Sequence, residues 1–435
     1  MKKYFIAYLF ISILFSQNWK PYHSEELEKN INTNVNFEVI DYIARQIPQY
    51  ENNFRNQLTH EVIGYLPYWE YAIYPTLDYN LITQLNYFSV EINQYGDIVD
   101  NHNWNDLYLI EFAHERDVKV KLCATLFGET ELNILLSNQN HRENAINNLL
   151  ELVINKNADG IDIDFELLPS NQRENLVLFV QELSETFHNA IEDPIITMAT
   201  PAIDWSNAWD YNTLASITDG LFIMGYNYFY SSSSFAGPVS PLGEYFYDLE
   251  YTVSDYLEKT GNQNDKIILG LPYYGYDWPV QNELMNSETT NSGISRTYSS
   301  ALSLLTDYDN NWNNDSNSSW IAYQNNDYWQ QCWYDDSLSL SRKYQFAINN
   351  NLSGIGIWAL GYDNGHNQLW GAISDQFTII SPGDFNADNI INILDVILIV
   401  NMILGYTEIQ ENADLNQDQI INIIDVITLI NIILS

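Results

Sequence analysis

Three carboxyl side chains at two-residue spacing are the strongest chemical signal in this sequence. They are Asp162, Asp164 and Glu166, in the stretch DGIDIDFE that begins at Asp159. Successive side chains of a β-strand point to opposite faces, so these three share one face and the apolar residues between them share the other. The apolar face can pack under helices, which leaves the carboxyls pointing into the interior of the sheet.

Carboxyls held this close together oppose each other's ionisation, and burial disfavours their charged form. We therefore expect at least one of the three to stay protonated near neutral pH. Cleavage of a glycosidic bond needs a carboxylic acid beside a carboxylate, because the leaving oxygen must receive a proton as the bond breaks. The alternative is an internal ion-binding cluster or a solvated strand end, which the alternation with apolar residues disfavours.

The elements around this row predict an α/β fold, a (β/α)8 TIM barrel. Short β-branched and aromatic runs alternate with helical patterns, for example at 141–155, 172–191 and 246–260. In such a barrel, chemistry sits at the C-terminal ends of the strands. We interpret the long polar interval at about 277–335 as a small inserted lobe after strand 7, which either deepens a groove or has no role. Strand candidates begin at Val62, Leu85, Val118, Asp159, Ile195, Asp219, Lys266 and Gly354.

Residues 60–378 resemble glycoside hydrolase family 18, the chitinase family. The family's fourth strand carries D-G-x-D-x-D-x-E, which matches the stretch from Asp159 to Glu166. Further matches lie in GYLPYW (first strand), MGYN (sixth), LGLPYYGYDW (seventh) and GIGIWALGYD (eighth). A set of five motifs in the right order is far more specific than any one of them.

The resemblance implies a substrate-assisted mechanism, which needs no protein nucleophile and no cofactor. Glu166 would protonate the glycosidic oxygen, while the substrate's own 2-acetamido carbonyl attacks the anomeric carbon. Asp164 would hold the acetamido N–H and stabilise the positive charge of the intermediate. Asp162 would share a proton with Asp164, and Tyr226 would hold the acetamido oxygen.

The same resemblance implies four substrate-binding residues. Trp358 would form an apolar floor under the distorted sugar, since a flat ring pairs well with the C–H face of a pyranose. Met224 and Tyr65 belong to the matching strand motifs. Asn227 stands where many family members have Asp; an amide still forms hydrogen bonds with a sugar but carries no charge, so the pH profile of the site is expected to shift.

The C-terminal residues 381–435 contain two matching twelve-residue segments, DFNADNIINILD and DLNQDQIINIID, each followed by an apolar run. Oxygen ligands at positions 1, 3, 5, 9 and 12 and a backbone carbonyl at position 7 suit a Ca2+ ion. We therefore expect two Ca2+ ions, against the alternative of a metal-free helical pair. The predicted ligands are Asp384, Asn386, Asp388, Ile390 (carbonyl), Asn392 and Asp395, and Asp414, Asn416, Asp418, Ile420 (carbonyl), Asn422 and Asp425.

These segments resemble a type I dockerin, in which a helix follows each loop. Position 6 is usually Gly, and here it is Asn389 and Gln419; because Gln tolerates a left-handed backbone poorly, we expect weaker binding in the second loop. Positions 10 and 11, which often carry hydroxyl residues in dockerins, are apolar in both repeats. An ordinary cohesin is therefore a doubtful partner, and a cohesin-like or cell-surface receptor is the alternative.

Composition and the N-terminus bound the remaining possibilities. With 17 basic and 57 acidic residues the net charge is −40, which disfavours nucleic acid and anionic membrane surfaces as partners.

Residues 1–16 have the layout of a signal peptide, and no later apolar run has the length of a membrane span, so we expect a secreted or cell-surface protein. Residues 17–59 suggest no function. The two cysteines, Cys123 and Cys332, are expected to be isolated buried thiols.

The sequence therefore predicts a secreted hydrolase of β-1,4-linked N-acetylglucosamine polymers such as chitin. Peptidoglycan and N-glycan cores contain the same acetamido group and are alternative substrates. A second alternative is a non-catalytic lectin on a hydrolase barrel, which retention of Glu166 disfavours because lectins of this type usually lose the acid.

Overall fold

The computed structural model describes residues 20–48, 58–378, 382–386, 390–407 and 409–434. They divide into two compact units, residues 20–48 with 60–376, and residues 58–59 with the described residues from 377 to 434. The predicted signal peptide, residues 1–16, lies outside the described residues. Among the residues that are described, no helix combines the length and apolarity that a membrane span needs.

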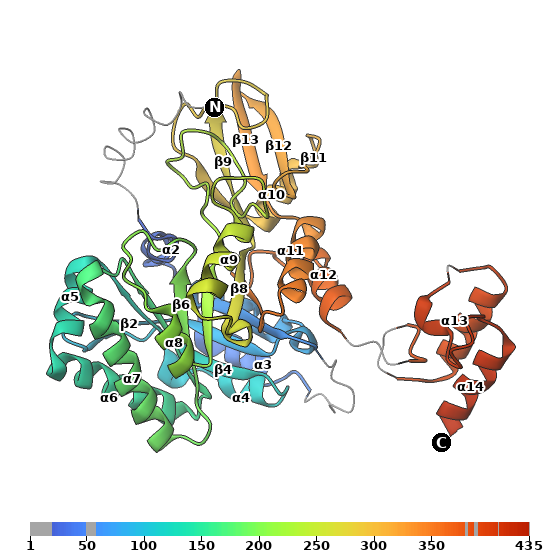
Figure 1. The fold of residues 1–435 in the computed structure, drawn as a ribbon, viewed down its shortest axis with the longest axis horizontal. Helices are drawn as coiled ribbons and strands as arrows, with labels where there is room; N and C mark the ends of the chain where they lie inside the picture. Colours follow the sequence, from blue (N-terminus) through green and yellow to red (C-terminus); the bar gives the residue numbers. More distant parts are fainter. Residues whose placement is uncertain (1–19, 49–57, 379–381, 387–389, 408, 435) are drawn as a thin grey trace. The chain divides into compact units, whose positions relative to one another are not determined.

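A closed parallel barrel forms the centre of the first unit (Figure 1). The strand order is β1-β14-β8-β7-β6-β5-β4-β2, and β1 pairs with both β14 and β2. Each predicted strand run is one of these strands, so the predicted (β/α)8 barrel is confirmed. The barrel strands are β1 (Glu61–Pro67), β2 (Gln84–Ile92), β4 (Lys119–Phe127), β5 (Gly160–Glu166), β6 (Ile195–Pro201), β7 (Gly220–Met224), β8 (Ile267–Pro272) and β14 (Gly354–Trp358), with β3 (Ile98–Asp100) antiparallel to β2.

Amphipathic helices cover the barrel on its outside. In α7 the buried residues recur at three- and four-residue spacing, and Phe179 packs against Phe165 of β5 with ring centroids 5.3 Å apart. The apolar face of β5 is therefore turned to the helices, as predicted, which leaves its carboxyl face to the barrel interior. The helices of this layer are α4 (Leu109–His114), α5 (Glu129–Ser137), α6 (Gln139–Lys156), α7 (Arg173–Ala190), α8 (Tyr211–Ile217), α9 (Leu249–Lys259), α11 (Ser337–Asn349) and α12 (Gln368–Phe377).

The predicted lobe after the seventh barrel strand is a small antiparallel sheet (Figure 1). Its strand order is β10-β9-β13-β12-β11, and helix α10 (Tyr298–Leu304) packs beside it. Trp278 and Trp333 are fully buried in it, and Trp320 stacks on Trp333 at 5.3 Å. The strands are β9 (Tyr274–Val280), β10 (Ile294–Thr297), β11 (Asn311–Asn313), β12 (Ser318–Asn325) and β13 (Tyr328–Tyr334).

Within the described residues 20–48, two further helices precede the barrel, in the segment to which the sequence assigned no function. They are α2 (Tyr22–Asn30) and α3 (Phe37–Ala44). Helix α3 is fixed to the barrel through Asp41, whose carboxylate accepts hydrogen bonds from the hydroxyls of Tyr71 and Tyr74 and from the backbone N–H of Tyr108. The exposed residues 31–34 separate the two helices.

The C-terminal unit contains α13 (Ile393–Ile403) and α14 (Ile423–Leu434), one after each predicted calcium loop. Val396, Ile399, Val426 and Leu429 form a common core, because they recur on one side of each helix. This helical pair matches the predicted dockerin-like architecture.

We predict that a buried ion pair ties the lobe to the barrel layer. Asp335, directly after β13, accepts a hydrogen bond from Lys343 of α11, and both side chains are almost fully buried. Lys343→Met leaves the carboxyl of Asp335 without its cation, so it should lower the free energy of unfolding by about 3 kcal/mol in denaturant titrations. Lys343→Met combined with Asp335→Asn should cost less than Lys343→Met alone; a larger cost would contradict the pairing.

Candidate active site

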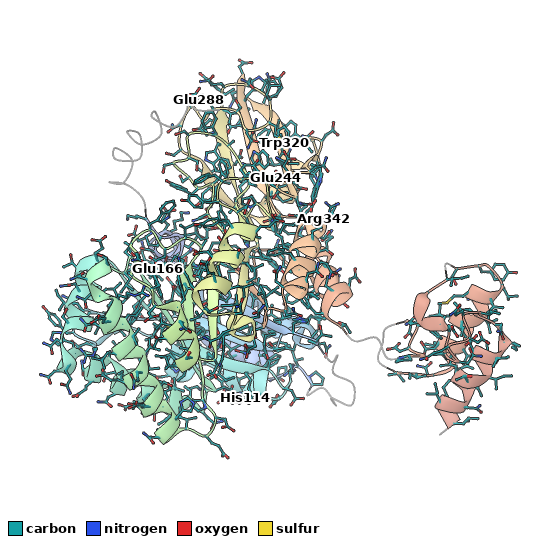
Figure 2. All side chains as sticks on the ribbon, viewed as in Figure 1. His114, Glu166, Glu244, Glu288, Trp320 and Arg342 are labelled. Carbon is teal, nitrogen blue, oxygen red and sulfur yellow. The ribbon has the colours of Figure 1, made fainter. Side chains whose placement is uncertain are left out.

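The three predicted carboxyls lie in the barrel interior, on β5. Asp162 and Asp164 are fully buried, and Glu166, at the C-terminal end of the strand, is 6% exposed. Figure 2 labels Glu166 at one end of the barrel and His114 at the other. The row thus runs from the middle of the barrel to the end at which barrel enzymes carry their chemistry.

Asp162, the deepest of the three, has partners for both of its oxygens. Its Oδ2 accepts hydrogen bonds from the Tyr65 hydroxyl at 2.6 Å and from the Cys123 thiol at 3.5 Å. Its Oδ1 accepts from Thr197 Oγ1 at 2.6 Å, and Thr197 in turn accepts from the buried Lys121 ammonium at 2.7 Å. Burial lowers the pKa of Lys121 to about 8. A cationic side chain near neutral pH is therefore linked to the carboxyl of Asp162 through one intervening hydroxyl.

Asp164 and Glu166 are less well satisfied, and each keeps one buried oxygen, Oδ1 and Oε1, without a hydrogen-bond partner. Burial is the main cause that raises the pKa of Glu166 well above its usual value, and the nearby charge of Asp164 raises it further. Burial also raises the pKa of Asp164, although His23 opposes that shift. Glu166 is thus held as a carboxylic acid beside a second carboxyl, which is the state that proton donation to a leaving group requires.

The free space at the site is a cavity of about 310 Å³ that begins at Glu166. Met224, Tyr226 and Asn227, three of the predicted site residues, line it from the end of β7. The exposed Trp205 and its edge-on neighbour Tyr247 line the far side. An apolar cleft that is lined by an acid suits a ligand with both apolar and polar faces, such as a sugar chain.

Asn227 has a left-handed backbone (φ 60°), and its Oδ1 accepts a hydrogen bond from Tyr274 at 2.6 Å. Tyr65 is fully buried with its hydroxyl on Asp162, so it lies beneath the carboxyl row and does not border the cavity. The site residues predicted from sequence therefore come together around β5, with Tyr65 as a partner of Asp162.

His23 of α2, which sequence reasoning missed, lies in the centre of this site. Its Nδ1 is 2.7 Å from Asp164 Oδ2, and its Nε2 is 2.7 Å from the Tyr226 hydroxyl. Burial raises the pKa of Tyr226, so the phenol keeps its proton and can donate it in a hydrogen bond to Nε2. In the imidazole tautomer that accepts this bond, Nδ1 carries the proton and donates to Asp164.

Aromatic rings complete the contacts of the segment. The imidazole of His23 stacks on Trp358 with ring centroids 3.6 Å apart and an interplanar angle of 23°. Tyr22 stacks on Tyr274 at 4.0 Å and 7°, and its edge faces Trp358. Trp358, predicted as the floor of the sugar site, is fully buried in the presence of these two residues.

One group of side chains at the site has a spacing that could hold a metal ion. The potential ligand atoms of His23, Asp164 and Glu166 lie within 4.8 Å of one another. The 2.7 Å separation between His23 Nδ1 and Asp164 Oδ2 is that of a direct hydrogen bond. It leaves no room for an ion between those atoms, so this geometry favours a hydrogen-bonded cluster.

The predicted calcium loops can be followed in the C-terminal unit. Asp395 and Asp425, at position 12 of each loop, are fully buried and accept hydrogen bonds from backbone N–H groups of their own loops. No residue between 382 and 434 is Lys, Arg or His, so no cationic side chain of this stretch pairs with these carboxylates. An oxygen-rich, uncompensated site of this kind fits Ca2+. Asp388, a predicted ligand, and Asn389 lie outside the described residues.

Comparison with known proteins places the two parts of the chain. Residues 382–434 match the model of the dockerin type I domain. The chain is 28% identical over 308 residues to the Bacillus subtilis protein named sporulation-specific glycosylase YdhD, a match that covers 66% of this chain and 69% of that protein. It is 25% identical to the di-N-acetylchitobiase of Rattus norvegicus over 307 residues, or 62% of this chain and 79% of that one.

Among solved structures, the GH18 chitinase of Cycas revoluta in complex with (GlcNAc)3 superposes with a TM-score of 0.66. The sequences are 19% identical, and the superposition covers 73% of this chain and 99% of the chitinase chain, so the similarity is one of fold. Residues 61–363 match the model of glycosyl hydrolases family 18, which spans most of the chain. The protein therefore belongs to glycosyl hydrolases family 18.

Proposed function

We propose that this protein is a secreted glycoside hydrolase that cleaves β-1,4-linked N-acetylglucosamine polymers, chitin or chito-oligosaccharides, by substrate-assisted retaining hydrolysis. One observation carries this proposal: the buried Glu166, whose pKa burial raises well above its usual value, lies beside Asp164. The carboxyl of Asp164 and the hydroxyl of Tyr226 present an acceptor and a donor to a group above Trp358. An acetamido group offers the complementary N–H and carbonyl.

In this mechanism Glu166 transfers its proton to the glycosidic oxygen as the bond to the anomeric carbon breaks. The acetamido carbonyl oxygen forms the new bond to that carbon, and the resulting oxazolinium ion is stabilised by the carboxylate of Asp164. Water then attacks the anomeric carbon from the face that the leaving group vacated, and Glu166 takes its proton. The acetamido group and the acid are regenerated, and the configuration is retained.

Assays with other polymers that contain N-acetylglucosamine would distinguish chitin from the alternative substrates. One relative is named a di-N-acetylchitobiase, which supports chitin fragments as candidates. Peptidoglycan stays a candidate because it contains the same acetamido group. We favour chitin because the cavity beyond Glu166 is lined by aromatic rings and needs only a neutral sugar chain. N-glycan cores are the further alternative, and binding without turnover would indicate a lectin.

For the C-terminal unit we propose two bound Ca2+ ions and a cohesin-like or cell-surface receptor. The side chains at positions 10 and 11 of both loops, Ile393 with Leu394 and Ile423 with Ile424, are 50–65% exposed. Two apolar pairs at equivalent places of a repeat support a receptor with an apolar docking face. A secreted or cell-surface location follows from this partner.

The acid is tested by Glu166→Gln, which keeps the shape of the side chain but has no proton to give. We expect turnover of a chromogenic chitotrioside to fall by at least about a thousandfold, with oligosaccharide binding retained. Phe165→Leu, on the helix-facing side of the same strand, is the matched control and should keep most of the activity. Unchanged turnover in Glu166→Gln would mean that another group is the acid.

The pH dependence follows from the direction of the Glu166 shift. Because the acid form is required and its pKa is raised, kcat/KM should persist above the usual titration range of Glu and fall only as pH rises through the higher value. Asp164→Asn removes one cause of the shift, so the alkaline limb of its residual activity should move to lower pH. A limb at the ordinary Glu pKa would contradict this assignment.

Calcium binding is tested by titration calorimetry of the full chain after treatment with EGTA. We expect two ions per chain and one ion in Asp414→Ala, which loses position 1 of the second loop only. Calcium should also raise the melting temperature of the C-terminal unit, since an ion at a hundred times its dissociation constant contributes about 2.7 kcal/mol. An unchanged stoichiometry in Asp414→Ala would show that the second loop binds no ion.

A further inference from the structure

The position that the proposed mechanism assigns to the sugar is already filled by the protein's own N-terminal segment. His23 meets the same three groups that an N-acetylglucosamine unit would meet: Asp164, Tyr226 and Trp358. It is fully buried among them. A sugar cannot reach those groups while this side chain is in place, because protein and sugar atoms would overlap.

The chemical match between His23 and the substrate is close. An acetamido group offers an N–H donor and a carbonyl acceptor, and the imidazole tautomer with its proton on Nδ1 offers Nδ1–H to Asp164 and Nε2 to Tyr226, each at 2.7 Å. The ring lies flat on Trp358, where a sugar face would lie. The imidazole therefore reproduces the donor, the acceptor and the apolar contact of the proposed substrate.

The rest of α2 holds the segment in the cleft. Tyr22 stacks on Tyr274, and Glu26 accepts a hydrogen bond from the buried Tyr362 hydroxyl at 2.7 Å. The Tyr68 hydroxyl donates to the carbonyl of Asn30, and Lys29 donates to Ser295 of the lobe. Tyr68 follows β1 and Tyr362 follows β14 of the barrel, whereas Tyr274 and Ser295 belong to β9 and β10 of the lobe. The segment therefore contacts both the barrel and the lobe at the site.

We propose that residues Lys20–Asn30 are an intramolecular inhibitor, in which His23 takes the place of the substrate's acetamido group and must leave before the polymer can bind. This inference rests on the proposed function, since it identifies the occupied position with a sugar site. The exposed residues 31–34 are the place at which the segment can swing out or be cut, because α3 behind them is fixed to the barrel through Asp41.

An inhibitor that competes for the substrate position raises the apparent KM and leaves kcat unchanged, because saturating substrate displaces it. In the full chain, His23→Ala should therefore lower KM for chito-oligosaccharides by at least about tenfold with kcat within about twofold. His188→Ala, an exposed histidine of α7, is the matched control and should change neither constant. If His23 instead positions Asp164 for catalysis, His23→Ala will lower kcat, and the proposal is overturned.

A second experiment keeps the wild-type His23. A specific protease site inserted between Thr33 and Asn34 allows the folded protein to be cut and the N-terminal fragment to be removed by gel filtration. The cut protein should show the lowered KM of His23→Ala. Adding a synthetic peptide of residues 18–33 should restore the higher KM competitively, and the same peptide with His23→Ala should not. An unchanged KM after removal of the fragment would overturn the inhibitor.

Direct peptide binding separates this inference from the proposed function. Fluorescence anisotropy of the labelled peptide should show binding to the cut protein and weaker binding to its Asp164→Asn form, whatever the substrate is. If no form of the protein cleaves chitin fragments, the proposed substrate is wrong, while this binding still supports an occluded site. Absence of peptide binding to the cut protein, together with full turnover by the uncut chain, would refute the inhibitor alone.

Discussion

The burial of three carboxyls in one barrel is the constraint on which the site depends, since like charges this close together cannot all ionise without compensation. Each carboxyl meets that constraint differently. Asp162 is surrounded by donors and linked through Thr197 to Lys121. Asp164 receives the N–H of His23, and Glu166 keeps its proton because burial raises its pKa. The raised pKa of the last carboxyl on the strand is what produces an acid at the mouth of the barrel.

Local sequence patterns predicted the parts of this arrangement that are themselves local. Two-residue alternation placed the carboxyls on one face of β5, and the contact of Phe165 with Phe179 shows the other face turned to α7. The barrel strands were predicted from short β-branched and aromatic runs, and the lobe from the long polar interval that interrupts them. The lining residues at the end of β7 followed from a family motif, which carries tertiary information that periodicity does not.

His23 could not be found in this way. Its partners Asp164 and Tyr226 are 141 and 203 residues away in the sequence, and its own surroundings are those of an ordinary short helix rich in Glu and Lys. The only local signal is a Tyr-His pair at the start of α2, which many surface helices share. The segment differs from an ordinary surface helix only in its packing against Tyr274 and Trp358. That packing depends on the three-dimensional arrangement of the barrel, which a local sequence pattern does not contain.

The energetics of an attached inhibitor explain how so short a segment can control the site. A tethered ligand acts at an effective concentration of the order of millimolar, so an intrinsic dissociation constant of about 0.1 mM already keeps the site closed more than nine times in ten. The two hydrogen bonds of His23 and the stacked rings of Tyr22 and His23 are the contacts that would supply such an affinity. A sugar polymer can still compete, because the cavity lined by Trp205 and Tyr247 stays open while His23 is bound and offers the chain additional contacts. On the inhibitor proposal, a ligand that reaches only the position above Trp358 must compete with the segment directly, whereas a longer chain can contact the open side first.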